Sequence, residues 1–109
     1  MVLIFGGAYQ GKLDYATERF GNGKKIINEI DKWILELVKE EADIEEAVRR
    51  FIDENPDAVL ICNDISCGVV PVDPIMRKWR EAVGRTLAAL SQKSDEVIRM
   101  FCGIPTKIK

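Results

Sequence analysis

The feature that most constrains the fold is a short apolar run that ends in glycines and leads into a helical pattern. Val2 to Phe5 is entirely apolar and precedes Gly6-Gly7, which is typical of a buried parallel strand. Gly11 to Phe20 then predicts a helix, which Gly21-Asn22-Gly23 ends. A buried strand that turns tightly into a helix begins a parallel crossover unit. This segment therefore indicates an α/β fold.

The rest of the chain continues the alternation of apolar strands and amphipathic helices. Ala58 to Cys62 gives the clearest strand, and the last helix carries an apolar stripe from Ile75 to Leu90. The expected helix starts are Asn28, Asp43 with Glu46, and Asp73 with Pro74. Weaker elements are expected as strands at Lys24–Ile27 and Glu96–Cys102, a loop at Asn63–Val72 and an extended tail at Pro105–Lys109.

This order of elements predicts one α/β domain over residues 1–109. We expect three layers, with helices covering a mainly parallel sheet of about four to five strands. Together with the loop described next, this is the architecture of a small P-loop NTPase-like domain.

Residues 6–12 read G-x-x-x-x-G-K, the beginning of the P-loop that holds nucleotide phosphates. Its glycines let backbone N–H groups turn toward a phosphate, and the following helix N-terminus adds partial positive charge. Lys12 is an expected catalytic residue because its ammonium would reach the terminal phosphates. The alternative interpretation is a tight strand-to-helix turn with an exposed lysine. The expected nucleotide-binding residues are Gly6, Gly7, Ala8, Tyr9, Gln10, Gly11, Lys12 and Leu13.

The next position departs from this pattern. A P-loop carries Ser or Thr there, whose hydroxyl binds Mg²⁺, whereas Leu13 supplies no oxygen and should pack into the core face of its helix. Mg²⁺ is therefore disfavoured as a cofactor. Asp64 is the second expected catalytic residue, because it follows a well-marked strand at the edge where parallel sheets bind ligands. Its alternative role is that of a turn residue, and the weaker carboxylate candidates are Glu29 and Asp31, beside Asn28.

The composition excludes several classes of chemistry. The 109 residues contain no histidine, which excludes a histidine base, a histidine nucleophile and histidine-bound zinc. A net charge of −2 argues against a nucleic-acid partner, and no apolar run reaches the roughly 20 residues of a membrane span. Three cysteines without a signal-peptide pattern indicate the reducing cytoplasm, and no metal site is expected among Cys62, Cys67 and Cys102.

The charges are not evenly distributed. Acidic residues are in excess between Lys39 and Asp57, and basic residues are in excess between Arg77 and Lys109. One interpretation is that both segments are solvated helix faces. The other is that an anionic ligand faces some of the basic residues Arg77, Lys78, Arg80 and Arg85.

Several motifs, in the right order and at both ends of the chain, resemble one family. Residues 6–12 look like the GGARSGKS motif of the bifunctional adenosylcobinamide kinase / adenosylcobinamide-phosphate guanylyltransferase family, which makes the nucleotide loop of cobalamin. Residues 63–71 are similar to its N-E-V-G-x-G-I-V-P loop, and residues 79–85 to its F-R-D-x-x-G-R helix. Residues 28–34 are similar to its D-C-L-T-x-W-L segment, and residues 94–109 to its closing A-D-E-V…G-x-P-x-x-x-K.

The departures from this family are equally specific. Family members are substantially longer, and the missing stretch falls between Phe20 and Lys24, where the family carries the histidine that becomes guanylylated. The family's Arg, Ser and metal-binding Ser in the loop are Tyr9, Gln10 and Leu13 here. Its acidic residue before the tryptophan helix is Asn28, and its Asn-Gln in the long helix is Leu87-Ala88. Asp64 occupies the glutamate position of the family's loop.

The resemblance implies a shortened relative that binds GTP, ATP or phosphate through Gly6–Lys12, with guanylyltransferase activity lost and kinase activity impaired. One alternative is a working nucleotide-dependent phosphotransferase for a corrinoid or another small alcohol, in which Asp64 or Glu29 replaces the missing metal ligand. A further alternative is a non-enzymatic interaction or regulatory module. The deletion should expose a sheet edge or apolar face, which predicts a homo-oligomer or a hetero-complex, and of these we expect the homo-oligomer.

Overall fold

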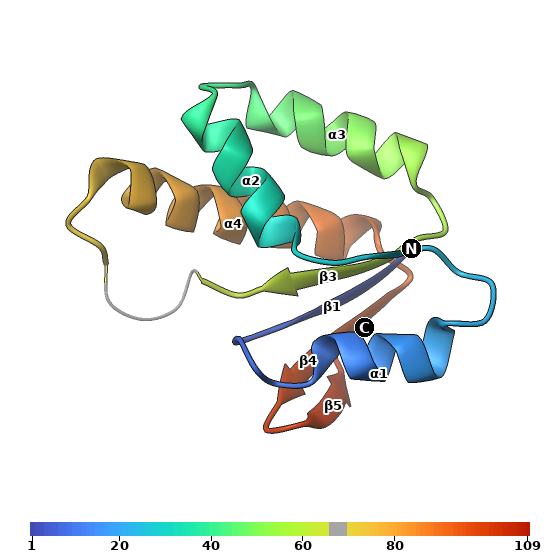
Figure 1. Cartoon of the computed structure of the whole chain (residues 1–109). Helices are drawn as coiled ribbons and strands as arrows, with labels where there is room; N and C mark the ends of the chain where they lie inside the picture. The colour runs from blue at the N-terminus through green and yellow to red at the C-terminus, as the bar shows by residue number, and fades with distance from the viewer. Residues whose placement is uncertain (66–69) are drawn as a thin grey trace.

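The structure is a computed structural model that describes residues 1–65 and 70–109, so Ser66 to Val69 of the expected loop lie outside the described residues. One five-stranded sheet has the order β2-β3-β1-β4-β5 and carries all the helices (Figure 1). The elements are β1 (Val2–Gly6), α1 (Lys12–Phe20), β2 (Ile26–Ile27), α2 (Ile30–Lys39), α3 (Ile44–Glu54), β3 (Val59–Asn63), α4 (Pro74–Lys93), β4 (Glu96–Phe101) and β5 (Ile104–Lys107).

The first strand is the centre of the sheet. β1 pairs in parallel with β3, which places Gly6 opposite Asn63, and in parallel with β4, which places Phe5 opposite Arg99. Leu3 and Ile4 are fully buried, as expected for a strand that is covered on both faces. The expected α/β fold with a mainly parallel sheet is confirmed.

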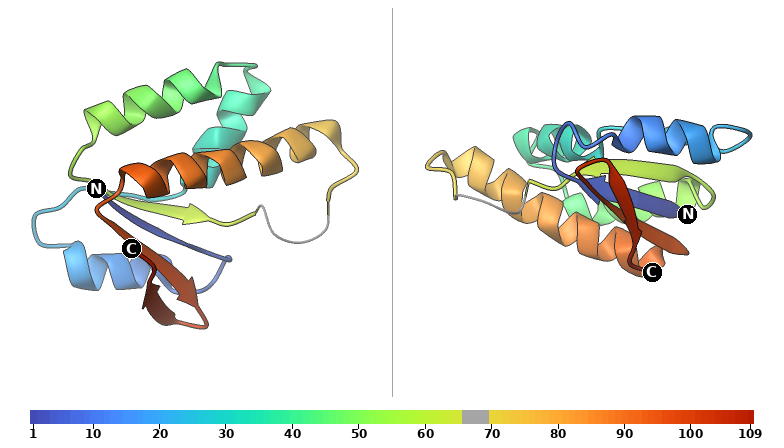
Figure 2. Two further views of the ribbon diagram at one scale, coloured as in Figure 1. Left: turned by 180° about the vertical axis from the view of Figure 1, so that it is seen from behind. Right: turned by 90° about the horizontal axis from the view of Figure 1, so that it is seen from below.

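The side chains of the sheet alternate between two hydrophobic cores. Leu3 and Leu60 point toward α2 and α4, with α3 packed outside them, while Ile4 and Ile61 point toward α1. Figure 2 shows α1 alone on one face of the sheet and the other three helices on the opposite face. This is the expected three-layer arrangement.

Two of the three expected helix starts are confirmed. The Asp43 carboxylate accepts a hydrogen bond from the Glu46 N–H, and Asp73 accepts from the N–H groups of Ile75 and Met76. The expectation for Asn28 is wrong. Glu29 occupies the N-cap position of α2 with a left-handed φ of 61° and no side-chain capping hydrogen bond, and the Asn28 side chain accepts from the Glu29 N–H in a local turn.

The chain's C-terminal segment differs from the expectation. The extended tail predicted at Pro105–Lys109 is largely strand β5, which pairs antiparallel with β4. Cys102 and Gly103 form the two-residue turn with φ values of 52° and 74°, and paired positive φ values of this kind suit a tight hairpin. The apolar stripe of α4 is also shorter than predicted, because Ile75 is exposed.

The helices of the described residues include none that is long and apolar enough to cross a membrane.

We expect Asp73→Ala to lower the free energy of unfolding by about 1 kcal/mol, because the first turn of α4 loses its only side-chain cap while Pro74 remains. Asp53→Ala, on the exposed face of α3, is the matched control and should change stability by less than about 0.5 kcal/mol. Urea denaturation followed by circular dichroism measures both. Equal effects of the two variants would contradict the capping role.

Candidate functional site

The glycine-rich loop joins the carboxyl end of β1 to the first turn of α1, as the sequence predicted. Gly6 lies where β1 closely approaches β4, since a Cβ there would lie 2.3 Å from the Met100 carbonyl oxygen. Tyr9 and Gly11 both have positive φ values, of 60° and 80°. Gly11 caps α1 without any side-chain hydrogen bond, so the N–H groups of the first turn are not taken by a capping side chain.

Lys12 is turned into the loop rather than into solvent. Its side chain is only 6% exposed, and its Nζ donates a hydrogen bond to the Gly7 carbonyl oxygen at 2.5 Å. The alternative of an exposed lysine on a simple turn is therefore wrong. Burial lowers the pKa of Lys12, and the negative charge of Asp31 opposes this shift.

Asp31, one of the weaker carboxylate candidates from the sequence, is buried in the structure. It follows the first residue of α2, and its side chain is buried at 3% exposure. Its Oδ1 accepts a hydrogen bond from the Asn63 N–H at 3.1 Å, and its Oδ2 accepts from the Asn63 side-chain amide at 3.4 Å. The signal in the sequence was weak, because a single acid at the start of a helix is normally explained by the helix dipole.

Asp64 lies at the same edge of the sheet. Its N–H donates to the Gly6 carbonyl oxygen at 2.8 Å, so its backbone is fixed beside the loop. Burial raises the pKa of the neighbouring Cys62 thiol to about 12, and the charges of Asp31 and Asp64 act in the same direction. The structure therefore brings together Lys12, Asp31 and Asp64 at the carboxyl ends of β1 and β3, where parallel sheets bind ligands.

The remaining residues of the loop and the first turn of α1 differ in their exposure and in their contacts. Tyr9 is fully exposed, and the Gln10 side chain accepts a hydrogen bond from the Cys102 N–H. Leu13 is 46% exposed, so the expectation that it packs into the core is wrong. It offers no oxygen for Mg²⁺, and the described residues hold no cluster of three or more His, Cys, Asp or Glu side chains suited to a metal. A divalent cation at this loop would need phosphate oxygens among its ligands.

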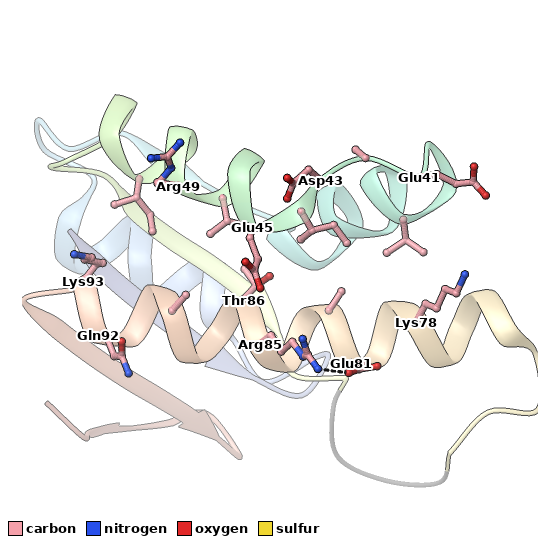
Figure 3. A pocket seen from close by; sticks show the side chains of 17 residues that line it. Glu41, Asp43, Glu45, Arg49, Lys78, Glu81, Arg85, Thr86, Gln92 and Lys93 are labelled. Atoms are coloured by element: carbon pink, nitrogen blue, oxygen red, sulfur yellow. Dashed lines mark hydrogen bonds and ion pairs between the residues drawn. The ribbon is translucent and has the colours of Figure 1, made fainter.

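A hollow lies at a different place, between two helices. A groove of about 930 Å³ separates α3 from α4, with apolar walls and charged rims, and none of the loop residues lines it (Figure 3). Two of the basic residues of α4 proposed to face an anion, Lys78 and Arg85, lie on its rim. Arg85 forms an ion pair with Glu81 at 2.6 Å, which favours the interpretation of a solvated face for that residue.

The fold and this edge of the sheet define an α/β protein with a P-loop-like strand–loop–helix unit. A family model described as cobinamide kinase / cobinamide phosphate guanyltransferase matches residues 23–108. The chain belongs to this family. The match begins after the glycine-rich loop, so the family assignment does not depend on the loop.

One curated relative is similar to part of the chain. It is the "Bifunctional adenosylcobalamin biosynthesis protein CobU" of Salmonella typhimurium, which is 37% identical over 51 residues. The alignment covers 47% of this chain and only 28% of the relative. The chain is thus related to a limited part of that protein.

We expect Gly6→Ala to lower the free energy of unfolding by about 2 kcal/mol or more, because Cβ would meet the Met100 backbone at a φ of 153° that favours glycine. Gly7→Ala is the matched control, since its Cβ would meet only the Gln10 side chain, at 3.9 Å. Thermal and urea unfolding distinguish the two. A Gly6→Ala protein as stable as Gly7→Ala would refute the close approach.

Proposed function

We propose that the chain binds a nucleoside triphosphate, GTP or ATP, through the loop from Gly6 to Lys12. The observation that carries this proposal is the buried Lys12, whose ammonium lies inside the glycine-rich loop against the Gly7 carbonyl. A lysine is rarely buried without a function or a partner, because removing its charge from water is unfavourable. A phosphate at the loop would give this ammonium an anionic hydrogen-bond partner in place of the neutral Gly7 carbonyl.

The surrounding backbone supports an anionic ligand. The first turn of α1 has no side-chain cap, so its N–H groups can donate to a phosphate, and the helix dipole favours negative charge at this end. The positive φ values of Tyr9 and Gly11 turn the loop within a short stretch of chain. Backbone donors of this kind bind phosphate oxygens, which GTP and ATP share. Contacts outside the loop would therefore have to distinguish the two bases.

Only part of the family's chemistry can be proposed for this chain. Guanylyl transfer through a histidine has no residue to carry it, since the sequence contains no histidine. Phosphoryl transfer to a corrinoid acceptor would depend on Lys12 and Asp64, and Leu13 deprives it of the usual Mg²⁺ ligand. We therefore propose nucleotide binding with weak or absent kinase activity, in a cytoplasmic protein.

Exposed apolar residues favour a second role in assembly. Phe101 and Ile104, which face each other across the hairpin of β4 and β5, are each more than half exposed, and so is Ile108 beyond the end of β5. Adjacent apolar side chains of this kind are typical of a contact surface. We propose that they contribute to a homo-oligomer. This places the contact at the opposite edge of the sheet from β2, which follows the site of the deletion.

Lys12→Met should weaken binding of GTP and ATP by about 10- to 100-fold, because the phosphates lose a charge-assisted hydrogen bond. The matched control is Lys32→Met, which removes an exposed lysine paired with Glu29 on α2 and should leave affinity unchanged. Isothermal titration calorimetry with each nucleotide measures the effect, and thermal unfolding verifies that both variants fold.

Absence of binding by the wild-type chain at millimolar GTP and ATP, with and without Mg²⁺, would overturn the proposed function. Equal affinities of the wild type and Lys12→Met would show that any binding occurs away from the loop.

A further inference from the structure

The turn between β4 and β5 lies directly beside the glycine-rich loop (Figure 1). The backbone N–H of Cys102, in this turn, donates a hydrogen bond to Oε1 of Gln10, in the loop. On the same side of the loop, Gly6 approaches the backbone of Met100 near the end of β4. The loop is therefore held against this end of the hairpin both by close backbone packing and by a side chain.

The Gln10 side-chain amide uses both of its ends. Its Oε1 accepts from the Cys102 N–H, while its Nε2 donates to the Ala8 carbonyl oxygen at 3.4 Å. The reverse orientation of the amide would place an NH₂ group against one donor and an oxygen against one acceptor. Gln10 thus joins a carbonyl inside the loop to a turn outside it. The family's motif has Ser at this position, and a serine side chain is shorter.

The N–H of Cys102 is a donor that the hairpin itself does not need. In a tight turn the hydrogen bond joins the first and fourth residues, and here these are Phe101 and Ile104, which pair across β4 and β5. The N–H of the second residue is left for a partner outside the turn, and Gln10 is that partner. Since β4 pairs with the central strand β1, the turn is a firm anchor for the loop.

The loop has a backbone conformation that benefits from an anchor. Tyr9, immediately before Gln10, has a left-handed φ of 60°, which a residue with a side chain adopts only where its surroundings maintain it. A loop that already has its binding conformation loses less conformational entropy when a ligand arrives. An anchor at Gln10 should therefore increase the affinity of the loop without touching the ligand.

We propose that Gln10 is a positioning residue, which holds the loop in its phosphate-binding conformation by anchoring it to the turn at Cys102. The inference rests on the proposed nucleotide function and deepens it. Because the ligand and the anchoring contact favour the same loop conformation, each strengthens the other. A bound nucleotide then protects the Cys102 N–H from exchange, and loss of the contact weakens nucleotide binding.

Two substitutions of Gln10 separate the contact from the bulk of the side chain. Gln10→Met keeps a side chain of similar length and removes the acceptor for the Cys102 N–H. Gln10→Glu retains an acceptor, and it is used without nucleotide because its charge would itself repel phosphate. Gln92→Met removes an exposed glutamine from α4 and is the matched control. Thermal unfolding verifies that all three variants fold.

Hydrogen exchange at the Cys102 N–H, followed by NMR, measures the contact, and calorimetric titration with GTP and ATP measures binding. Without nucleotide, Gln10→Met should exchange at least about 5-fold faster than the wild type, whereas Gln10→Glu should remain close to it. Gln10→Met should bind both nucleotides about 5-fold more weakly, and Gln92→Met should bind like the wild type. Saturating nucleotide should slow the exchange in the wild type by a similar factor.

Three results contradict the positioning role and leave the proposed function intact. The first is equal exchange at Cys102 in the wild type and Gln10→Met, and the second is faster exchange in Gln10→Met with unchanged nucleotide affinity. The third is exchange in the wild type that bound nucleotide does not slow. Absence of binding by the wild type at millimolar GTP and ATP is a different outcome, because it removes the proposed function and the positioning role together.

Discussion

The structure depends on the close contact between the carboxyl end of β1 and the strands on either side of it. Gly6 can accept the Met100 backbone on one side because it has no side chain, and its carbonyl oxygen accepts from the Asp64 N–H on the other. These contacts fix where the chain leaves the sheet. The loop, the buried Lys12 and the first turn of α1 all follow within a few residues of that point, so their positions are set by backbone packing rather than by a ligand.

Much of this fold could be predicted from local patterns. The apolar run from Val2 to Phe5, the strand at Ala58–Cys62 and the Asp73–Pro74 helix start each carry a short-range signal that the structure confirms. The strand β5 was missed because Ile104 to Lys107 has little alternation, and because a hairpin turn at Cys102-Gly103 requires a left-handed non-glycine residue. Asn28 failed as a cap because a polar residue before a helix can equally form a local turn.

The site shows a different limit of sequence reasoning. The loop was recognisable from the spacing of Gly6, Gly11 and Lys12, because phosphate binding by backbone groups demands that spacing. The position of Asp31 near Lys12 was not recognisable, because the two residues lie on different helices and Asn63 holds Asp31 at the end of β3. Burial decides its importance, and burial follows from the packing of α2 against β3 and α4. Leu13 shows the opposite case, because its apolar side chain was expected in the core and is nearly half exposed.

Membership of the cobinamide kinase / cobinamide phosphate guanyltransferase family rests on residues 23–108, whereas the proposed phosphate site precedes this range. The two parts of the chain are joined physically at Gly6, whose carbonyl oxygen accepts a hydrogen bond from the N–H of Asp64 in the family-matched part.

Strand β5 affects whether a strand from another molecule can pair with this edge of the sheet. The Ile108 N–H donates inward to Val97, and alternation along the strand then directs the backbone nitrogens of Pro105 and Lys107 outward. Proline has no N–H to offer, and the charged Lys107 discourages an incoming strand. These two residues therefore disfavour continuation of the hydrogen-bond ladder by a neighbouring molecule along this border, and they favour contacts made through side chains. The hairpin can thus expose apolar residues without promoting repeated edge-to-edge pairing of strands between molecules.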